Sequence, residues 1–242
     1  MNSINATSVK DMIDAFPYEE LPKIEGKPTL AKMMVAIKHL VKCARTFDDT
    51  TLGPMGMIFL VMSPQQYATY SQIPYVPPVV PGPNPTYPVD ADDNQREAIR
   101  IAWLNNKKEY DNVRNMNRAL IKFFLASMEE AYTTDVESDF VGIANQTFLQ
   151  LINYYLDTYG RLIPREWQDN KDNMLKPWDP STPITHLFRQ INDSAEYARF
   201  ANQPFAVFEL VNAGELGILA TGVYGTQYEE WRAIPAAARD WE

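Results

Sequence analysis

Residues 90–132, DADDNQREAIRIAWLNNKKEYDNVRNMNRALIKFFLASMEEAY, contain neither proline nor glycine. Apolar side chains recur through them at spacings typical of one helix face: Ile99, Trp103, Tyr110, Val113, Leu120, Ile121, Phe124 and Met128. Asp92 and Asp93 stand where a helix N-terminus favours negative charge. The stretch predicts one long helix or two helices with a kink, so helices organise the fold.

The flanking sequence repeats the helical period. Apolar stripes run through residues 28–44, 145–160 and 183–198, and Pro204 opens a further helical segment through Phe205, Phe208 and Val211. Glycines follow it, so we expect shorter helices around 216–220 and 226–231. Ser63 and Pro64 have the form of an N-cap followed by proline at the first helical position. Strand patterns with a period of two are almost absent. The sequence therefore predicts an all-α fold.

A proline-rich loop separates two of these helical regions. Seven of the 15 residues 74–88 are proline, and proline lacks the amide donor that a helix or a central strand requires. The loop is either a stiff connector or a ligand for a proline-binding partner. The candidate partner-binding residues of the loop are Pro77, Pro78, Pro81 and Pro83.

Composition limits the classes of partner. The chain has 242 residues, 45% of them hydrophobic, a formal charge of −9 and a pI near 4.8. An acidic surface repels phosphate, which argues against general binding to nucleic acid or anionic lipid. A basic flank in the central helix is interrupted by Glu109 and Asp111, so we interpret it as a solvated face rather than a nucleic-acid groove; its cations are Lys107, Lys108, Arg114 and Arg118. The apolar run MGMIFLVM at 55–62 has eight residues, against about 20 needed to span a bilayer, and we expect it in the core.

No residues form a recognisable catalytic, metal or cofactor-binding motif. The sequence lacks HExxH, GxSxG, GxxxxGK[ST] and GxGxxG. His39 and Cys43 lie four residues apart and are either half of a metal site or a core-edge imidazole beside a buried thiol; the single cysteine and distant second histidine, His186, favour the latter. We expect no enzyme, no small-molecule substrate and no cofactor.

The order of short phrases in the second half is more specific than any one of them. Leu156-Asp-Thr-Tyr-Gly160 ends a helix, Pro177-Trp-Asp-Pro180 follows a polar segment, and Pro183-Ile-Thr-His-Leu-Phe188 starts the next helix. An Ala198-Arg-Phe-Ala201 turn and Glu230-Trp-Arg232 complete the series. This order resembles the Gag-like capsid region of copia-class retrotransposons, particularly the Gag-type proteins common in microalgal genomes.

The resemblance implies two small helical lobes and self-assembly into a shell around the element's RNA, in cytoplasmic particles. Residues 1–27, with Pro17, Pro22 and Gly26, form an N-terminal arm by their composition. Together with the resemblance, the pattern predicts an N-terminal lobe at 28–163, a linker at 164–182 and a C-terminal lobe at 183–242. Gag proteins usually carry a basic tail or a Cys/His knuckle after the capsid region, and neither motif occurs here. We therefore expect RNA to be bound through a tail absent from this chain or through some other surface.

Two sets of residues are candidates for the assembly function. Pro177, Trp178, Pro180 and Pro183 interrupt helical structure between two amphipathic segments and predict a hinge. Exposed aromatics supply assembly contacts if they do not lie in the cores of their own lobes; the candidates are Trp167, Trp178, Tyr228 and Trp231.

Two other hypotheses remain open at this point. One is a domesticated, Gag-derived adaptor that binds a host protein through the loop at 74–88. The other is a helical enzyme whose site the sequence does not reveal.

Overall fold

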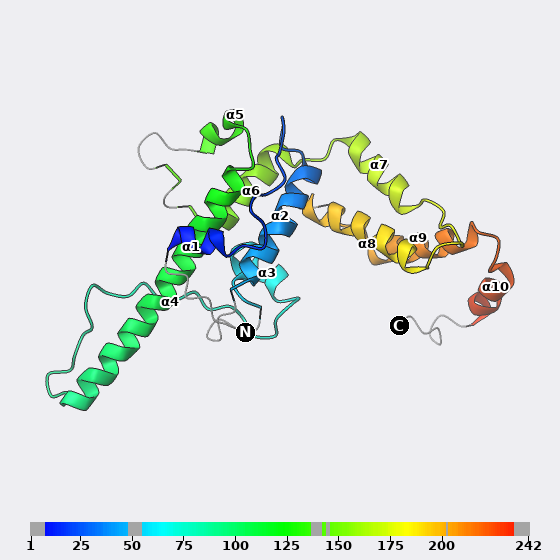
Figure 1. Cartoon of the computed structure of the whole chain (residues 1–242). Helices are drawn as coiled ribbons and strands as arrows, with labels where there is room; N and C mark the ends of the chain where they lie inside the picture. Colours follow the sequence, from blue (N-terminus) through cyan, green and yellow to red (C-terminus); the bar gives the residue numbers. More distant parts are fainter. Residues whose placement is uncertain (1–7, 48–54, 137–141, 144–145, 202, 235–242) are drawn as a thin grey trace. The chain divides into compact units, whose positions relative to one another are not determined.

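The chain folds into helices that form two compact units. A computed structural model describes residues 8–47, 55–136, 142–143, 146–201 and 203–234 (Figure 1). No β-strand occurs in these residues, which confirms the all-α prediction; the nearest approach to one is an isolated bridge between Ile24 and Met128. The units are Met1–Tyr159 and Gly160–Glu242.

Three helices enclose the core of unit 1. They are α2 (Leu30–Arg45), α4 (Asp93–Leu125) and α6 (Phe148–Tyr159). The ring of Phe124 meets Phe148 and Tyr155 edge to face, with centroids 5.7 and 5.6 Å apart, a geometry that aromatic pairs favour. The hydroxyl of Tyr155 donates to the carbonyl of Tyr132 at 2.7 Å, so its polar end is satisfied inside the core.

The side chain of Asn117 on α4 makes two hydrogen bonds to the backbone at the start of α6. The Oδ1 atom of Asn117 accepts from the amide of Phe148 at 2.7 Å, and its Nδ2 atom donates to the carbonyl of Gln146 at 3.2 Å. Thr147 caps the helix, since its hydroxyl accepts from the amide of Gln150. Asn145, two residues earlier, also has the residue type of an N-cap, but it lies outside the described part of the chain.

The N-terminal arm belongs to unit 1. Its helix α1 (Val9–Asp14) begins in a capping box between Ser8 and Asp11 and packs against α4. Phe16 meets Phe123 edge to face at 5.2 Å. The amide of Ile24 donates to the carbonyl of Ser127 at 2.8 Å. The arm is ordered by the long helix on which it lies.

Short helices fill the remaining space of unit 1. These are η1 (Ile58–Leu60), α3 (Pro64–Tyr67), α5 (Glu130–Thr133) and η2 (Thr134–Val136). The run at 55–62 contributes Met57, Ile58, Phe59 and Val61 to the core, as predicted. Ser63 and Gln66 form a capping box at the start of α3, as the Ser-Pro signal indicated.

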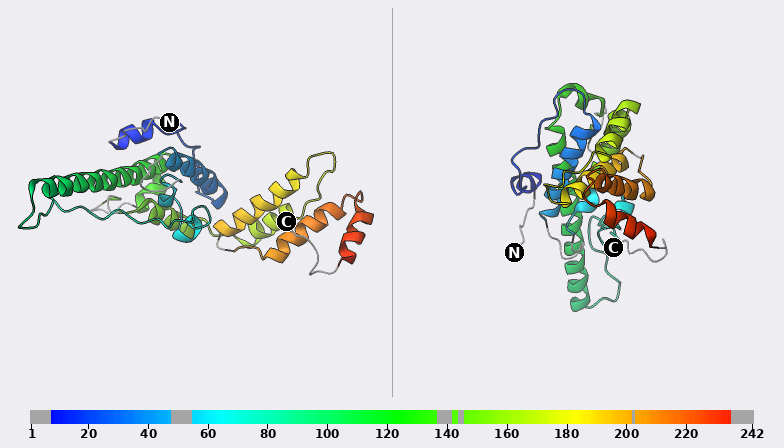
Figure 2. Two further views of the ribbon diagram at one scale, coloured as in Figure 1. Left: turned by 90° about the horizontal axis from the view of Figure 1, so that it is seen from below. Right: turned by 90° about the vertical axis from the view of Figure 1, so that its right-hand side faces the viewer.

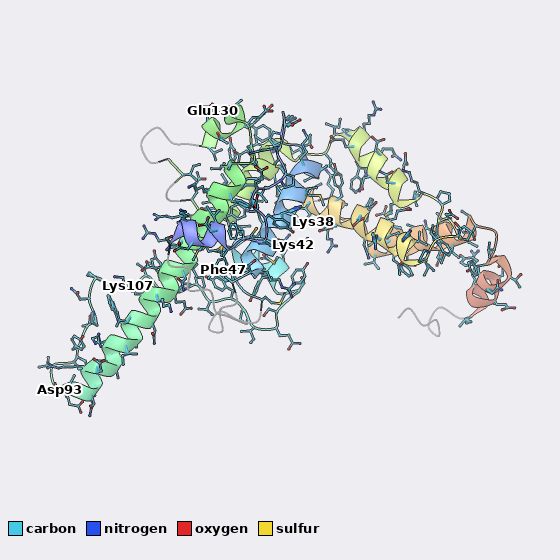
Figure 3. The ribbon with its side chains drawn as sticks, in the orientation of Figure 1. Lys38, Lys42, Phe47, Asp93, Lys107 and Glu130 are labelled. Carbon is cyan, nitrogen blue, oxygen red and sulfur yellow. The ribbon has the colours of Figure 1, made fainter. Side chains whose placement is uncertain are left out.

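Helix α4 is continuous over 33 residues, which decides between the one-helix and two-helix predictions. A capping box between Asp92 and Gln95 begins it. Its buried side chains start at Met116, so the first two thirds extend past the core (Figures 1 and 2). Figure 3 marks Asp93 at the tip of this extension and Lys107 farther along it.

The described residues of unit 2 form four helices: α7 (Pro164–Met174), α8 (Thr185–Phe200), α9 (Val207–Leu219) and α10 (Gly225–Ala233). Helix α8 is central, since α7 and α9 both pack on it. The core cluster contains Met174, Trp178, Leu187, Ile191, Ala198, Phe205 and Ala213. A Cβ atom placed on Gly217 would lie 2.7 Å from Leu187, so glycine permits the close approach of α9 to α8.

The boundary between the units differs from the predicted linker at 164–182. It falls between Tyr159 and Gly160, and the expected linker contains α7, a full helix of unit 2. The polar sequence of α7 concealed it, because only Asn170 and Met174 are buried. Its start is stabilised by the Glu166 carboxylate, which accepts from the amide of Ile163.

Candidate functional site

No chemical centre is visible in the described residues. Among them, no group of three or more His, Cys, Asp or Glu side chains is arranged to hold a metal ion. Cys43 is fully buried, and burial raises the pKa of its thiol to about 12, which keeps it protonated and unreactive. His39 bonds through Nδ1 to the carbonyl of Val35 at 2.7 Å and lies against the ring of Tyr18. None of the described helices is both long and apolar enough to cross a membrane.

The predicted hinge lies inside unit 2. Residues 177–183 join α7 to α8, and internal hydrogen bonds hold the connection. The carboxylate of Asp179 accepts from the amide of Ser181 at 2.9 Å, which lowers the pKa of Asp179. The hydroxyl of Thr182 donates to the carbonyl of Asp179 at 2.8 Å. The side chain of Gln190 donates to the carbonyl of Lys176 at 2.8 Å. Pro177, Pro180 and Pro183 therefore lie in a hydrogen-bonded connection within one unit, rather than in a hinge between two units.

Two of the predicted assembly contacts are used inside unit 2. Trp178 is 8% exposed, and its Nε1 atom donates to the hydroxyl of Thr182 at 3.1 Å. Its ring stacks with Tyr224, with centroids 6.4 Å apart. Trp167 is half-buried and stacks on Phe205 at 4.7 Å. Both side chains stabilise their own unit, so Trp178 in particular presents almost no surface to a neighbour.

The other two predicted contacts lie on α10. Tyr228 is half-buried, and its hydroxyl donates to the carboxylate of Glu215 on α9 at 3.0 Å. The side chain of Trp231 lies outside the described part of the structure. Of these two predicted contacts, the described one, Tyr228, is therefore engaged within unit 2.

Sequence reasoning missed an apolar surface on α8 and α9. Phe188 is 51% exposed, Phe208 74% and Val207 77%, with Ile184 also exposed. We call these four residues the open face of the α8–α9 hairpin. Phe188 lies within the apolar stripe predicted at 183–198, and Phe208 lies within the helical segment predicted from Pro204, yet both side chains are exposed.

The position of α7 explains why the open face is uncovered. Leu187 and Ile191 of α8 approach Gly217 and Gly214 of α9 respectively, so the two helices are antiparallel. Leu187 marks the side of α8 that faces α9. Because successive residues turn by about 100° around a helix, Gln190 projects to one side of Leu187, and Ile184 and Phe188 project to the other side. Gln190 bonds to the α7 end at Met174, so α7 covers the first side.

The same reasoning applies to α9. Glu209 reaches Lys171 of α7, with the carboxylate and ammonium 3.4 Å apart, whereas Val207 projects about 160° away around the helix. In an antiparallel pair these two uncovered flanks face the same way. Ile184, Phe188 and Val207 therefore lie on the side of the hairpin away from α7, with Phe208 at its outer edge.

A second candidate surface is the proline-rich loop in unit 1. It runs along the projecting part of α4 (Figures 1 and 2) without helix or strand. Tyr75 stacks on Phe59, with centroids 3.4 Å apart, and Trp103 Nε1 donates to the carbonyl of Gly82 at 3.0 Å. Burial and the nearby Glu109 carboxylate raise the pKa of Tyr75. Of the predicted partner residues, Pro77 and Pro83 are exposed, whereas Pro78 and Pro81 are half-buried.

The cations of α4 do not form a groove. All four predicted basic residues are exposed, and the Lys107 ammonium lies 5.1 Å from the centre of the Trp103 ring. An open depression of about 330 Å³ lies near the end of the helix, lined by Arg118, Ile121, Lys122, Leu125, Ile143 and Gln146. It is open to solvent, and among the described residues no buried side-chain nitrogen or oxygen lacks a hydrogen-bond partner that a ligand there could satisfy.

Comparison with known proteins found no matching family model, no matching curated protein and no matching solved structure. The geometry of the chain therefore supplies the evidence for its function.

Proposed function

We propose that the chain is a Gag-type capsid protein, similar to those of copia-class retrotransposons, whose work is self-association into a shell. One observation carries the proposal: on the side away from α7, the α8–α9 hairpin exposes Ile184 and Phe188 on one helix and, farther along the antiparallel pair, Val207 and Phe208 on the other. Two copies of such a face can bury each other about a two-fold axis, because the same residues then meet in both directions.

The size of the face fits a weak, repeated contact. A phenylalanine side chain buries about 200 Å² when fully covered. At 74% exposure, Phe208 offers about 150 Å², which corresponds to roughly 4 kcal/mol at about 25 cal/mol per Å². Loss of translational and rotational freedom offsets much of such a gain. A shell of many copies requires contacts of this modest strength.

The charge of the chain limits how the RNA is held. With a net charge of −9, the enclosed RNA is held by a segment outside these 242 residues or by a local surface, rather than by the chain's general field. The product is a cytoplasmic particle. Neither a membrane nor a small-molecule substrate has a role in it.

The test is the association state of the purified full chain. Mass photometry and negative-stain microscopy, over a range of protein and salt concentrations, should show oligomers and closed particles. The Phe188→Ser/Phe208→Ser double variant should raise the dissociation constant at least tenfold without changing the far-UV circular dichroism spectrum. Tyr70→Ser removes an exposed aromatic of unit 1 and should leave assembly unchanged. A chain that stays monomeric at every concentration and salt condition would refute the proposal.

A further inference from the structure

In the proline-rich loop, partly buried residues recur at every third position from 75 to 81. Tyr75, Pro78 and Pro81 are half-buried, three residues apart. Each pair of residues between or after them is exposed: Val76 and Pro77, Val79 and Val80, Gly82 and Pro83. Polyproline II has three residues per turn, so this segment packs one edge inward and turns two edges outward.

The loop is also held in place. The stack of Tyr75 on Phe59 fixes one end, and the hydrogen bond from Trp103 to Gly82 fixes the other. A segment already ordered in the conformation that a partner requires loses less entropy on binding than a free chain does. The loop therefore presents its outward pairs on a prepared backbone.

The chemistry of the outward pairs selects the kind of partner. From Ser71 to Val89 no residue carries a charge, so a groove that recognises acidic or basic peptides finds no ion pair. The prolines lack amide donors, so the loop cannot extend a partner's β-sheet as a regular edge strand. The remaining mode is an aromatic-lined groove that accepts a polyproline II helix.

We propose that the loop is a docking segment for a proline-binding domain of another protein, read through its outward pairs at 76–77, 79–80 and 82–83. The proposal is independent of shell formation, since the loop belongs to unit 1 and the open face to unit 2. It divides the four prolines singled out from the sequence. Pro77 and Pro83 face the partner, whereas Pro78 and Pro81 hold the loop against its own chain.

Purified SH3, WW and EVH1 domains, arrayed on a surface and probed with the labelled full chain, provide the test. At least one domain should bind, and the dissociation constant is then measured in solution by titration calorimetry. The Pro77→Ala/Pro83→Ala variant should weaken binding at least tenfold. The matched Pro78→Ala/Pro81→Ala variant removes the same number of prolines and should weaken binding by less than about threefold.

Three outcomes would overturn the proposal. The first is an array in which no domain binds the full chain. The second is an inner-edge variant that loses as much affinity as the outer-edge variant, which would place recognition on the edge now packed inward. The third is an outer-edge variant that dissociates oligomers of the chain but leaves domain binding unchanged, which would make a second copy the occupant. Thermal melts of both variants show that neither result comes from unfolding.

Discussion

Replacing Trp178 by alanine separates a core role from an assembly role for this side chain. Trp178 is 8% exposed and belongs to the core cluster of unit 2. Truncation of a buried tryptophan to alanine costs about 3–5 kcal/mol. The indole also satisfies the hydroxyl of Thr182. A domain of the size of unit 2 has a total stability of about 4–12 kcal/mol, so Trp178→Ala should remove a large part of it.

Urea denaturation of the full chain, followed by far-UV circular dichroism, measures the loss. We expect Trp178→Ala to lower the unfolding free energy of the unit 2 transition by about 3 kcal/mol or more. Trp178→Phe keeps most of the ring and should cost less. Trp103→Ala is the matched control: this tryptophan is only half-buried, donates one hydrogen bond to the carbonyl of Gly82 and lies beside the Lys107 ammonium, so its removal should cost about 1 kcal/mol.

One result would refute the reasoning. Suppose that the unfolding free energy of Trp178→Ala lies within about 0.5 kcal/mol of the value for the chain without the substitution, and that the variant self-associates more weakly. The indole then acts at an interface between copies, as predicted from the sequence.

Two further results are expected in unit 1. Gly56 has φ of +58°, and a Cβ atom there would lie 2.8 Å from the carbonyl oxygen of Phe47, whereas Gly26 has φ of +62° and open space around it. Both Gly→Ala changes incur about 1–2 kcal/mol of left-handed strain, so Gly56→Ala should lose clearly more stability than Gly26→Ala in urea titrations. Equal losses would contradict the packing at Gly56. For Cys43 the folded pKa is raised to about 12, so above the unfolded value near 8.5 the unfolded chain releases its thiol proton first and stability falls as pH rises toward 12. Cys43→Ala should flatten that part of the pH–stability curve, and a native chain whose thiol reacts with Ellman's reagent at pH 8 as fast as the unfolded chain does would refute the burial.

The sequence predicted the helices better than it predicted their partners. The long helix at 93–125 and the helix at 148–159 follow directly from periodic apolar residues and from the absence of proline and glycine. Helix α7 escaped because a helix that buries only Asn170 and Met174 leaves little periodic signal. The predicted linker therefore contains an element of the core.

The side chains that face solvent could not be identified from one sequence. Leu187 and Phe188 are adjacent and equally apolar, yet only one can face α9, and the choice depends on where α7 packs. Trp178 shows the opposite case: flanking prolines suggested a hinge, but the turn folds its indole into the core. Burial depends on the tertiary arrangement, which adjacent residues in the sequence do not encode.

The projecting part of α4 has a consequence for the motions of unit 1. From Asp93 to Asn115, about 35 Å of helix at 1.5 Å per residue, no side chain is fully buried, and a helix with little tertiary packing is only weakly stabilised in water. Its amide protons should therefore exchange with solvent through local opening, well below the energy of global unfolding. Because Trp103 joins the helix to Gly82, the opening of the helix releases the loop as well. A ligand that holds the loop must then slow hydrogen exchange along the helix, at amides it never touches.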